Sequence, residues 1–220
     1  IYEDERLLII NKPAGLAVHG GSGVSYGVIE GFRQLRPDEP NLELAHRLDR
    51  DTSGCLILCK KRLYLKKIQA VLQDKSSLQK HYQAIVHGRW PKRKQHVDVP
   101  IRKNTLKSGE RVCIVAADGK PSLTEFSVNR QNDQLSLLDV RPVTGRTHQI
   151  RVHAQYLKHP IVGDPKYGNP GLDAVISPLA TPRLMLHAAR LVLPPLDKGD
   201  KVLTVEAPPC ERFMSLMNSI

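Results

Sequence analysis

The alternation of apolar and polar residues along the chain predicts a protein built mainly from strands. Successive side chains of a strand point to opposite faces, so an apolar residue at every second position marks one buried face. This pattern recurs at residues 6–12, 54–61, 81–88, 123–130, 134–141, 187–194 and 201–207. Each of these stretches is predicted to be a strand.

A helical period, in which apolar residues recur every three or four positions, marks three further stretches. They are residues 25–36, 62–73 and 148–157, and Thr147 is the expected N-cap of the last. Several strands follow one another with no helix between them, which argues against a doubly wound sheet. The expected fold class is therefore α+β, with a mixed, largely antiparallel central sheet flanked by helices.

The composition narrows the class of partner. The chain has 220 residues, with 33 Lys and Arg against 22 Asp and Glu, and its net charge of +11 favours a polyanion such as nucleic acid. No apolar run approaches the roughly 18 residues that a membrane helix needs. The four cysteines lack a CxxC spacing and are expected to be free, largely buried thiols. We expect a cytoplasmic protein that forms one globular unit.

The stretch HRLDRDTSG (46–54) places five charged or titratable residues between two apolar stretches. Its simplest interpretation is a turn that precedes a strand. Asp49, however, lies between Arg47 and Arg50, and cationic neighbours hold a carboxylate in its ionised form. An ionised and oriented carboxylate can act as a nucleophile or a base, so Asp49 is a candidate catalytic residue.

The stretch GRTHQIRVH (145–153) leads into the third predicted helix. Arg146 and Arg151 are either surface charges of an amphipathic helix or part of a site. His148 and His153 are five positions apart, about 140° around a helix, so they do not form a shared metal-binding face. We expect no metal here.

The stretch KHYQAIVHG (80–88) carries Tyr82 on a predicted strand. A strand tyrosine is usually a packing residue. In an enzyme that acts on nucleic acid, it could equally stack against an extruded base.

These stretches together resemble a known family. The motifs are NKPAGLAVHGG (11–21), HRLDRDTSG (46–54), KHYQAIVHG (80–88), GRTHQIRVH (145–153), HPIVGDPKYG (159–168) and LHAARL (186–191). In order and spacing they resemble the RluA-type family of RNA pseudouridine synthases, most of all its RluC branch, which acts on 23S ribosomal RNA of the large subunit. The resemblance covers essentially the whole chain.

The resemblance implies a fold, an activity and a domain organisation. It implies the pseudouridine synthase fold, with an active-site cleft across the sheet, and conversion of specific uridines of large-subunit ribosomal RNA to pseudouridine. It also implies an enzyme that needs neither metal nor organic cofactor. We further expect a monomer that binds no membrane. Residues 1–220 would form the catalytic domain. Because the chain begins at Ile1, we expect a fragment without the S4-type RNA-binding domain that often precedes it.

The resemblance also assigns roles to individual residues. Asp49 would attack or deprotonate the ribose of the target uridine, and Arg151 would pair with Asp49. Tyr82 would stack on the uracil, and Arg47 would fill the space that the flipped nucleotide leaves. Further candidates for phosphate contacts are Lys12, Arg146 and Lys166.

Two other functions fit parts of the pattern. A metal-dependent RNA nuclease could use Asp49, Asp51 and Asp164, and it would shorten its substrate and lose activity with a chelator. A non-catalytic basic RNA-binding module would leave HRLDRDTSG as a structural turn. Loss of pseudouridine formation in an Asp49→Asn variant that still binds RNA would separate both from an isomerase.

Overall fold

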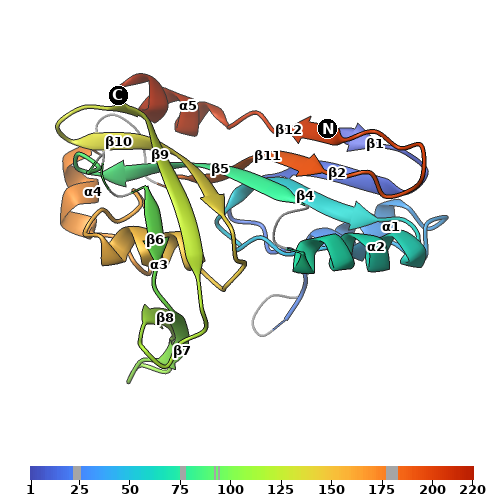
Figure 1. Cartoon of the computed structure of the whole chain (residues 1–220), viewed down its shortest axis with the longest axis horizontal. Coiled ribbons are helices and arrows are strands. Elements are labelled where there is room, and N and C mark those ends of the chain that lie inside the picture. The colour runs from blue at the N-terminus through green and yellow to red at the C-terminus, as the bar shows by residue number, and fades with distance from the viewer. Residues whose placement is uncertain (22–25, 75–77, 92, 94, 177–182) are drawn as a thin grey trace. The chain divides into compact units, whose positions relative to one another are not determined.

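The structure, a computed structural model, describes residues 1–21, 26–74, 78–91, 93, 95–176 and 183–220 (Figure 1). Its described part divides into two compact units. The first consists of Ile1–Lys80 and His187–Pro209, and the second of His81–Leu186 and Cys210–Ile220.

The first unit contains all or most of the residues of five strands that pair side by side in one sheet. These are β1 (Tyr2–Glu3), β2 (Leu7–Lys12), β4 (Ser53–Cys59), β11 (Leu186–Leu193) and β12 (Leu203–Glu206), which pair in this order, while β3 (Glu43–Leu44) pairs with β4. Only the β4–β11 pair is parallel among these. The helices are α1 (Val28–Leu35) and α2 (Arg62–Gln73).

Strand β4 lies at the centre of this unit, and all seven of its residues are buried. Its alternate side chains Cys55, Ile57 and Cys59 pack with Leu65 and Ile68 of α2, which runs below β4 in Figure 1. A strand with both faces covered has no polar face, which explains its continuous apolar sequence.

The cysteines are free thiols, and three of the four are buried, as predicted; Cys210 is exposed. Burial raises the pKa of Cys55 to about 11 and that of Cys59 to about 12. Both groups are therefore protonated packing residues at neutral pH.

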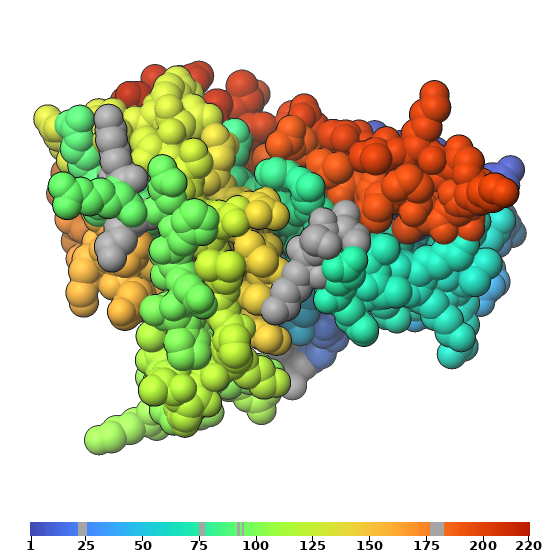
Figure 2. All heavy atoms as spheres, viewed as in Figure 1, coloured from blue at the N-terminus to red at the C-terminus, as the bar shows by residue number. Residues whose placement is uncertain are grey.

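The second unit is built on an antiparallel sheet. Its strands β5 (Gln79–His87), β10 (Leu135–Pro142), β9 (Leu123–Gln131) and β6 (His96–Asp98) pair in this order, and β7 (Ile101–Thr105) and β8 (Arg111–Val115) form a separate hairpin. The hairpin projects at the end of the lime-green part of the surface in Figure 2. The helices are α3 (Gln149–Tyr156), α4 (Pro170–Ile176) and α5 (Glu211–Asn218).

The apolar core of the second unit joins the sheet to its helices. Ile150 and Ala154 of α3 and Phe213 of α5 belong to one cluster with Ile85 of β5 and Leu138 of β10. Because α3 is part of this core, the side chains that it carries are held in fixed positions.

The predicted fold class is confirmed, and every predicted strand and helix is present. The N-cap of α3 is His148, with φ 54°, and not Thr147 as predicted. A left-handed conformation is uncommon for a residue other than glycine, and here the ring lies 2.7 Å from the Tyr167 hydroxyl. Residues 22–25, in the glycine-rich stretch 19–27, lie outside the described residues.

The elements that the periodicity missed are short or polar. They are β1, β3, β6, α4, α5 and the β7–β8 hairpin, whose strand β7 reads IRKNT. Strands of two or three residues contain too few positions for a period to be visible. The helices that the structure describes are too short or too polar to cross a membrane.

Candidate active site

The stretch HRLDRDTSG forms a tight turn in the first unit, as predicted. The backbone N–H of Thr52 donates to the carbonyl of Asp49 at 3.1 Å, and β4 begins at Ser53. Gly54 has φ +110°, and a Cβ at this position would lie 2.2 Å from the carbonyl oxygen of Ala188. Only glycine fits there, so the turn approaches β11 as closely as a backbone can.

A buried histidine anchors this turn from the opposite strand. The Nε2 atom of His187 lies 2.8 Å from the Ala207 carbonyl, and its Nδ1 lies 2.8 Å from the Ser53 hydroxyl. A carbonyl only accepts, so Nε2 carries the proton and Nδ1 accepts from Ser53. His187 therefore joins the turn, β11 and the segment after β12.

His46 is a structural residue of the same loop. Its Nε2 accepts the backbone N–H of Ile57 at 3.2 Å. Burial, and secondly the charge of Lys80, lower the pKa of His46 to about 3, and burial lowers the pKa of Lys80. The ring is neutral at physiological pH, as its role as an acceptor requires.

Lys12 holds the segment before the turn. Its ammonium donates to the carbonyls of Pro13, Leu16 and Arg50 at 2.9, 2.8 and 2.9 Å, and its side chain is buried. This arrangement does not fit the phosphate contact expected for Lys12. It makes Lys12 the link between NKPAGL and the turn that carries Asp49.

Arg50 and Asp51, which follow Asp49 in the turn, form an ion pair. Arg50 directs its Nε to Asp51 Oδ1 at 3.3 Å, and the effect of the neighbouring arginines on Asp49 stays a prediction. Asp49 itself is half-buried, and Arg47 is exposed. The roles expected for Asp49 and Arg47 stay predictions.

In the second unit, Gln149 fixes the start of α3. Its Oε1 accepts the Thr144 hydroxyl at 2.6 Å and the Arg146 backbone N–H at 3.0 Å. Its Nε2 donates to the Leu123 carbonyl and to Thr124 Oγ1, both at 2.9 Å. Of these four hydrogen bonds, two hold the segment before α3 and two join the GRTHQIR segment to β9.

The two histidines of the same motif also serve the fold. His153 contacts Thr124 Oγ1 through Nδ1 and the Val99 carbonyl through Nε2, at 2.9 and 3.1 Å. His148 contacts the Tyr167 hydroxyl. Among the residues that the structure describes, no cluster of three or more His, Cys, Asp or Glu side chains is arranged to hold a metal ion.

Arg151 is buried, so its interpretation as a surface charge is wrong. Only 3% of the residue is exposed, and its guanidinium pairs with Asp164, with Nε 2.8 Å from Oδ2 and Nη2 2.7 Å from Oδ1. Sequence reasoning missed this partner, although Asp164 lies in the quoted motif HPIVGDPKYG. The pairing of Arg151 with Asp49 would join the two units and stays a prediction.

Tyr82 is half-buried on β5, opposite Val140 of β10, and packs against the core of the second unit. Packing of the ring is thus established, whereas stacking on a uracil stays a prediction. Of the predicted residues, Lys12, Arg47 and Asp49 lie in the first unit. Tyr82, Arg146, Arg151 and Lys166 lie in the second.

The two remaining candidates for phosphate contacts lie at the surface and already bond to the protein. Arg146 is half-exposed and donates from Nε to the Pro121 carbonyl at 3.1 Å. Lys166 is exposed and contacts Glu110 at 2.7 Å and the Arg111 carbonyl at 3.0 Å. The contact of Arg146 and Lys166 with RNA phosphates stays a prediction.

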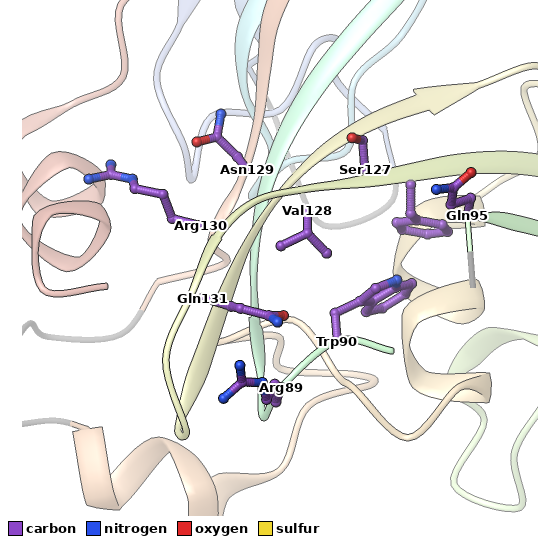
Figure 3. A pocket seen from close by; sticks show the side chains of 9 residues that line it. Arg89, Trp90, Gln95, Ser127, Val128, Asn129, Arg130 and Gln131 are labelled. Atoms are coloured by element: carbon purple, nitrogen blue, oxygen red, sulfur yellow. The ribbon is translucent and has the colours of Figure 1, made fainter. Parts of the chain in front are cut away.

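A surface pocket of about 480 Å³ lies along β9 (Figure 3). Val128 points toward Trp90, whose ring lies 4.6 Å from that of Phe126. Trp90 is only 2% exposed, so this aromatic pair is a packing contact and offers no platform for a base. None of the predicted site residues lines this pocket, so it is separate from the candidate site.

Comparison with known proteins identifies the class of this chain. A family model described as RNA pseudouridylate synthase matches residues 6–156, which include Asp49, Tyr82 and Arg151. The chain belongs to the RNA pseudouridylate synthase family. The resemblance inferred from the six motifs is therefore confirmed.

Curated members of the family are similar over most of the chain. Ribosomal large subunit pseudouridine synthase C of Salmonella typhi is 50% identical over 210 residues, which are 94% of this chain and 65% of that protein. The Pasteurella multocida (strain Pm70) protein of the same name is 52% identical over 188 residues, 86% of this chain and 57% of that protein. The chain thus spans less than two thirds of these relatives.

Solved structures of the family have the same fold. Human RNA Pseudouridylate Synthase Domain Containing 4 superposes with a TM-score of 0.76 at 25% identity, over 99% of this chain and 90% of that chain. Human RNA Pseudouridylate Synthase Domain Containing 1 gives 0.74 at 26% identity, over 95% and 82%. The expected pseudouridine synthase fold is confirmed.

Proposed function

We propose that this protein converts uridines of large-subunit ribosomal RNA to pseudouridine. The observation that carries the proposal is 50% identity, over 94% of the chain, to Ribosomal large subunit pseudouridine synthase C of Salmonella typhi. The net charge of +11 supports an RNA substrate. We further propose that the protein acts in the cytoplasm as a monomer, without metal or organic cofactor.

The proposed reaction is an isomerisation. The N1–C1′ bond of the target uridine breaks, the uracil turns, and a C5–C1′ bond forms; C5 loses a proton and N1 gains one. No water molecule is consumed, so the pair of carboxylates that most glycoside hydrolases use is not needed. Asp49 is the proposed single carboxylate, acting either as a nucleophile at C1′ or as a base at C2′.

Three further residues would support Asp49. Arg151 is the proposed cationic partner, and its burial and planar guanidinium suit it to orient a carboxylate. Tyr82 would stack on the uracil, and the exposed Arg47 would occupy the gap in the RNA stack. Target uridines in a duplex must be flipped out, which costs a few kcal/mol, and a stacked guanidinium can return part of it.

The nuclease alternative is disfavoured by the surroundings of its proposed metal ligands. Both oxygens of Asp164 accept hydrogen bonds from Arg151, and Asp51 pairs with Arg50. A carboxylate already held by a buried arginine is a poor ligand for a second cation. Asp164 is therefore not available to bind a metal ion.

A tritium-release assay tests the proposal. A large-subunit ribosomal RNA transcript carrying tritium at uridine C5 should lose the label to water and keep its length, with and without EDTA. Asp49→Asn should fold, bind RNA and release no tritium. Asp51→Asn, which removes the neighbouring carboxylate, should remain active. Release by Asp49→Asn at the parent rate, or none by the parent, would refute the proposal.

A further inference from the structure

Backbone hydrogen bonds hold the Asp164 carboxylate in place independently of its pairing with Arg151. Its Oδ1 accepts the backbone N–H groups of Lys166 and Tyr167 at 2.9 and 3.0 Å, and the side chains of Asp164 and Arg151 are 0% and 4% exposed. Backbone donors in a tight turn cannot move independently of the chain. The carboxylate is therefore a fixed receptor for the guanidinium.

Tyr167 constrains the same guanidinium from a second direction. The Cζ atom of Arg151 lies 5.0 Å from the centre of the Tyr167 ring. The Tyr167 hydroxyl accepts the Cys113 backbone N–H at 2.8 Å, and its own proton can be donated to His148 Nδ1, which lies 2.7 Å away. Burial raises the pKa of Tyr167 to about 12, so the phenol keeps this proton.

These contacts fix both the position and the plane of the guanidinium. The pair with Asp164 uses Nε and Nη2, on one side of the group. A guanidinium has a second bidentate edge, formed by its two terminal nitrogens. Asp164 and Tyr167 together determine the direction in which that edge points.

We propose that Asp164 is a positioning residue for pseudouridine formation, which sets the orientation of Arg151 toward the reacting groups. The inference rests on the proposed function, because it assumes that Arg151 orients the reactive carboxylate. Asp164 contacts no substrate in this scheme. Asp164 acts through Arg151, and the ring of Tyr167 restricts the orientation of the guanidinium plane.

A structural ion pair and a positioning pair predict different kinetics. If Asp164 only stabilises the fold, variants that remain folded should turn over normally. If it positions Arg151, a folded variant should bind RNA normally and react slowly, since displacement of a catalytic group by about 1 Å can reduce a rate about 10²-fold.

The experiment measures single-turnover tritium release and RNA dissociation constants for the parent, Asp164→Asn and Asp164→Glu, each checked for folding by circular dichroism. Asp164→Asn should lose about 10²-fold in rate with RNA affinity within about twofold of the parent. Asp164→Glu restores the charge but displaces the carboxylate by one methylene. It should give an intermediate rate.

Asp173→Asn is the matched control. Asp173 lies in the same unit, accepts from the Gly163 backbone N–H at 3.0 Å and contacts His87 Nε2 at 2.8 Å, and it makes no bond to Arg151. It should lose stability and keep its rate.

Parent-level turnover in folded Asp164→Asn, or equal losses in Asp164→Asn and Asp173→Asn, would overturn the inference. If Asp164→Asn does not fold, turnover of Asp164→Glu at the parent rate would overturn the inference. A parent protein that releases no tritium would instead refute the proposed function.

Discussion

Replacement of Lys12 by methionine should destabilise the first unit. Methionine keeps the apolar stem and removes the ammonium, which leaves the carbonyls of Pro13, Leu16 and Arg50 without that donor. Hydrogen bonds to a charged group contribute about 1.5–3 kcal/mol each, but contributions at one shared donor are not additive. A buried acceptor left unsatisfied costs about 1–3 kcal/mol, and we expect a decrease of about 3 kcal/mol in unfolding free energy.

Urea unfolding followed by circular dichroism measures this change, through the shift of the midpoint at constant slope. Lys166→Met is the control, because Lys166 is an exposed side chain whose ion pair with Glu110 should contribute only about 0–1 kcal/mol. Because the Lys12 ammonium also holds the Arg50 carbonyl, beside Asp49, tritium release should fall along with stability.

The competing role of Lys12, a phosphate contact, predicts a different result. RNA affinity falls with salt, and loss of one phosphate contact reduces the magnitude of the slope of log K against log salt concentration by about 0.9. Filter binding over a range of salt measures that slope. A slope reduced by this amount, with the unfolding free energy within about 1 kcal/mol of the parent, would refute the structural role argued here.

Three further predictions concern the turn. Because the pKa of His46 falls from 6.5 to about 3 on folding, the unfolded chain binds a proton at a higher pH than the folded protein does. The unfolding free energy should therefore drop as the pH falls below 6.5, by up to about 1.4 kcal/mol per pH unit. His46→Gln keeps an acceptor for the Ile57 backbone N–H and should reduce this pH dependence, as measured by urea unfolding at several pH values. Gly54→Ala should lower the unfolding free energy by about 3 kcal/mol or more, because strain at positive φ adds to the collision of the new Cβ with the Ala188 backbone, and thermal unfolding measures the loss. Arg47→Ala should slow tritium release from a duplex target by about tenfold more than from a single strand, since only the duplex must be opened; equal losses on both RNAs would contradict this role.

The long helices and strands could be predicted because apolar residues recur regularly along their whole length. Strand β4 and helix α2 each have a regular apolar pattern, and α2 begins and ends at the predicted residues, Arg62 and Gln73. The β7–β8 hairpin could not be found in this way, because β7 is largely exposed and polar. Its register depends on pairing with β8 and on packing near Tyr167.

The candidate residues could be named from the sequence, but most of their partners could not. His187 lies 134 positions from Ser53, and Asp164 lies 13 positions from Arg151. No local pattern states which of several carboxylates a buried arginine will meet. The backbone N–H groups that fix Asp164 become visible only once the turn has formed.

The motifs contain more residues that build the site than residues that react in it. In GRTHQIRVH, Gln149 uses its whole amide in four hydrogen bonds to the fold, and both nitrogens of His153 are occupied. Variants of Gln149 should therefore lose activity in proportion to their loss of stability. Asp49→Asn should lose activity with little change in stability. A motif match is thus chiefly evidence for a scaffold. The reactive group is expected to be the residue whose replacement abolishes activity while the scaffold stays intact.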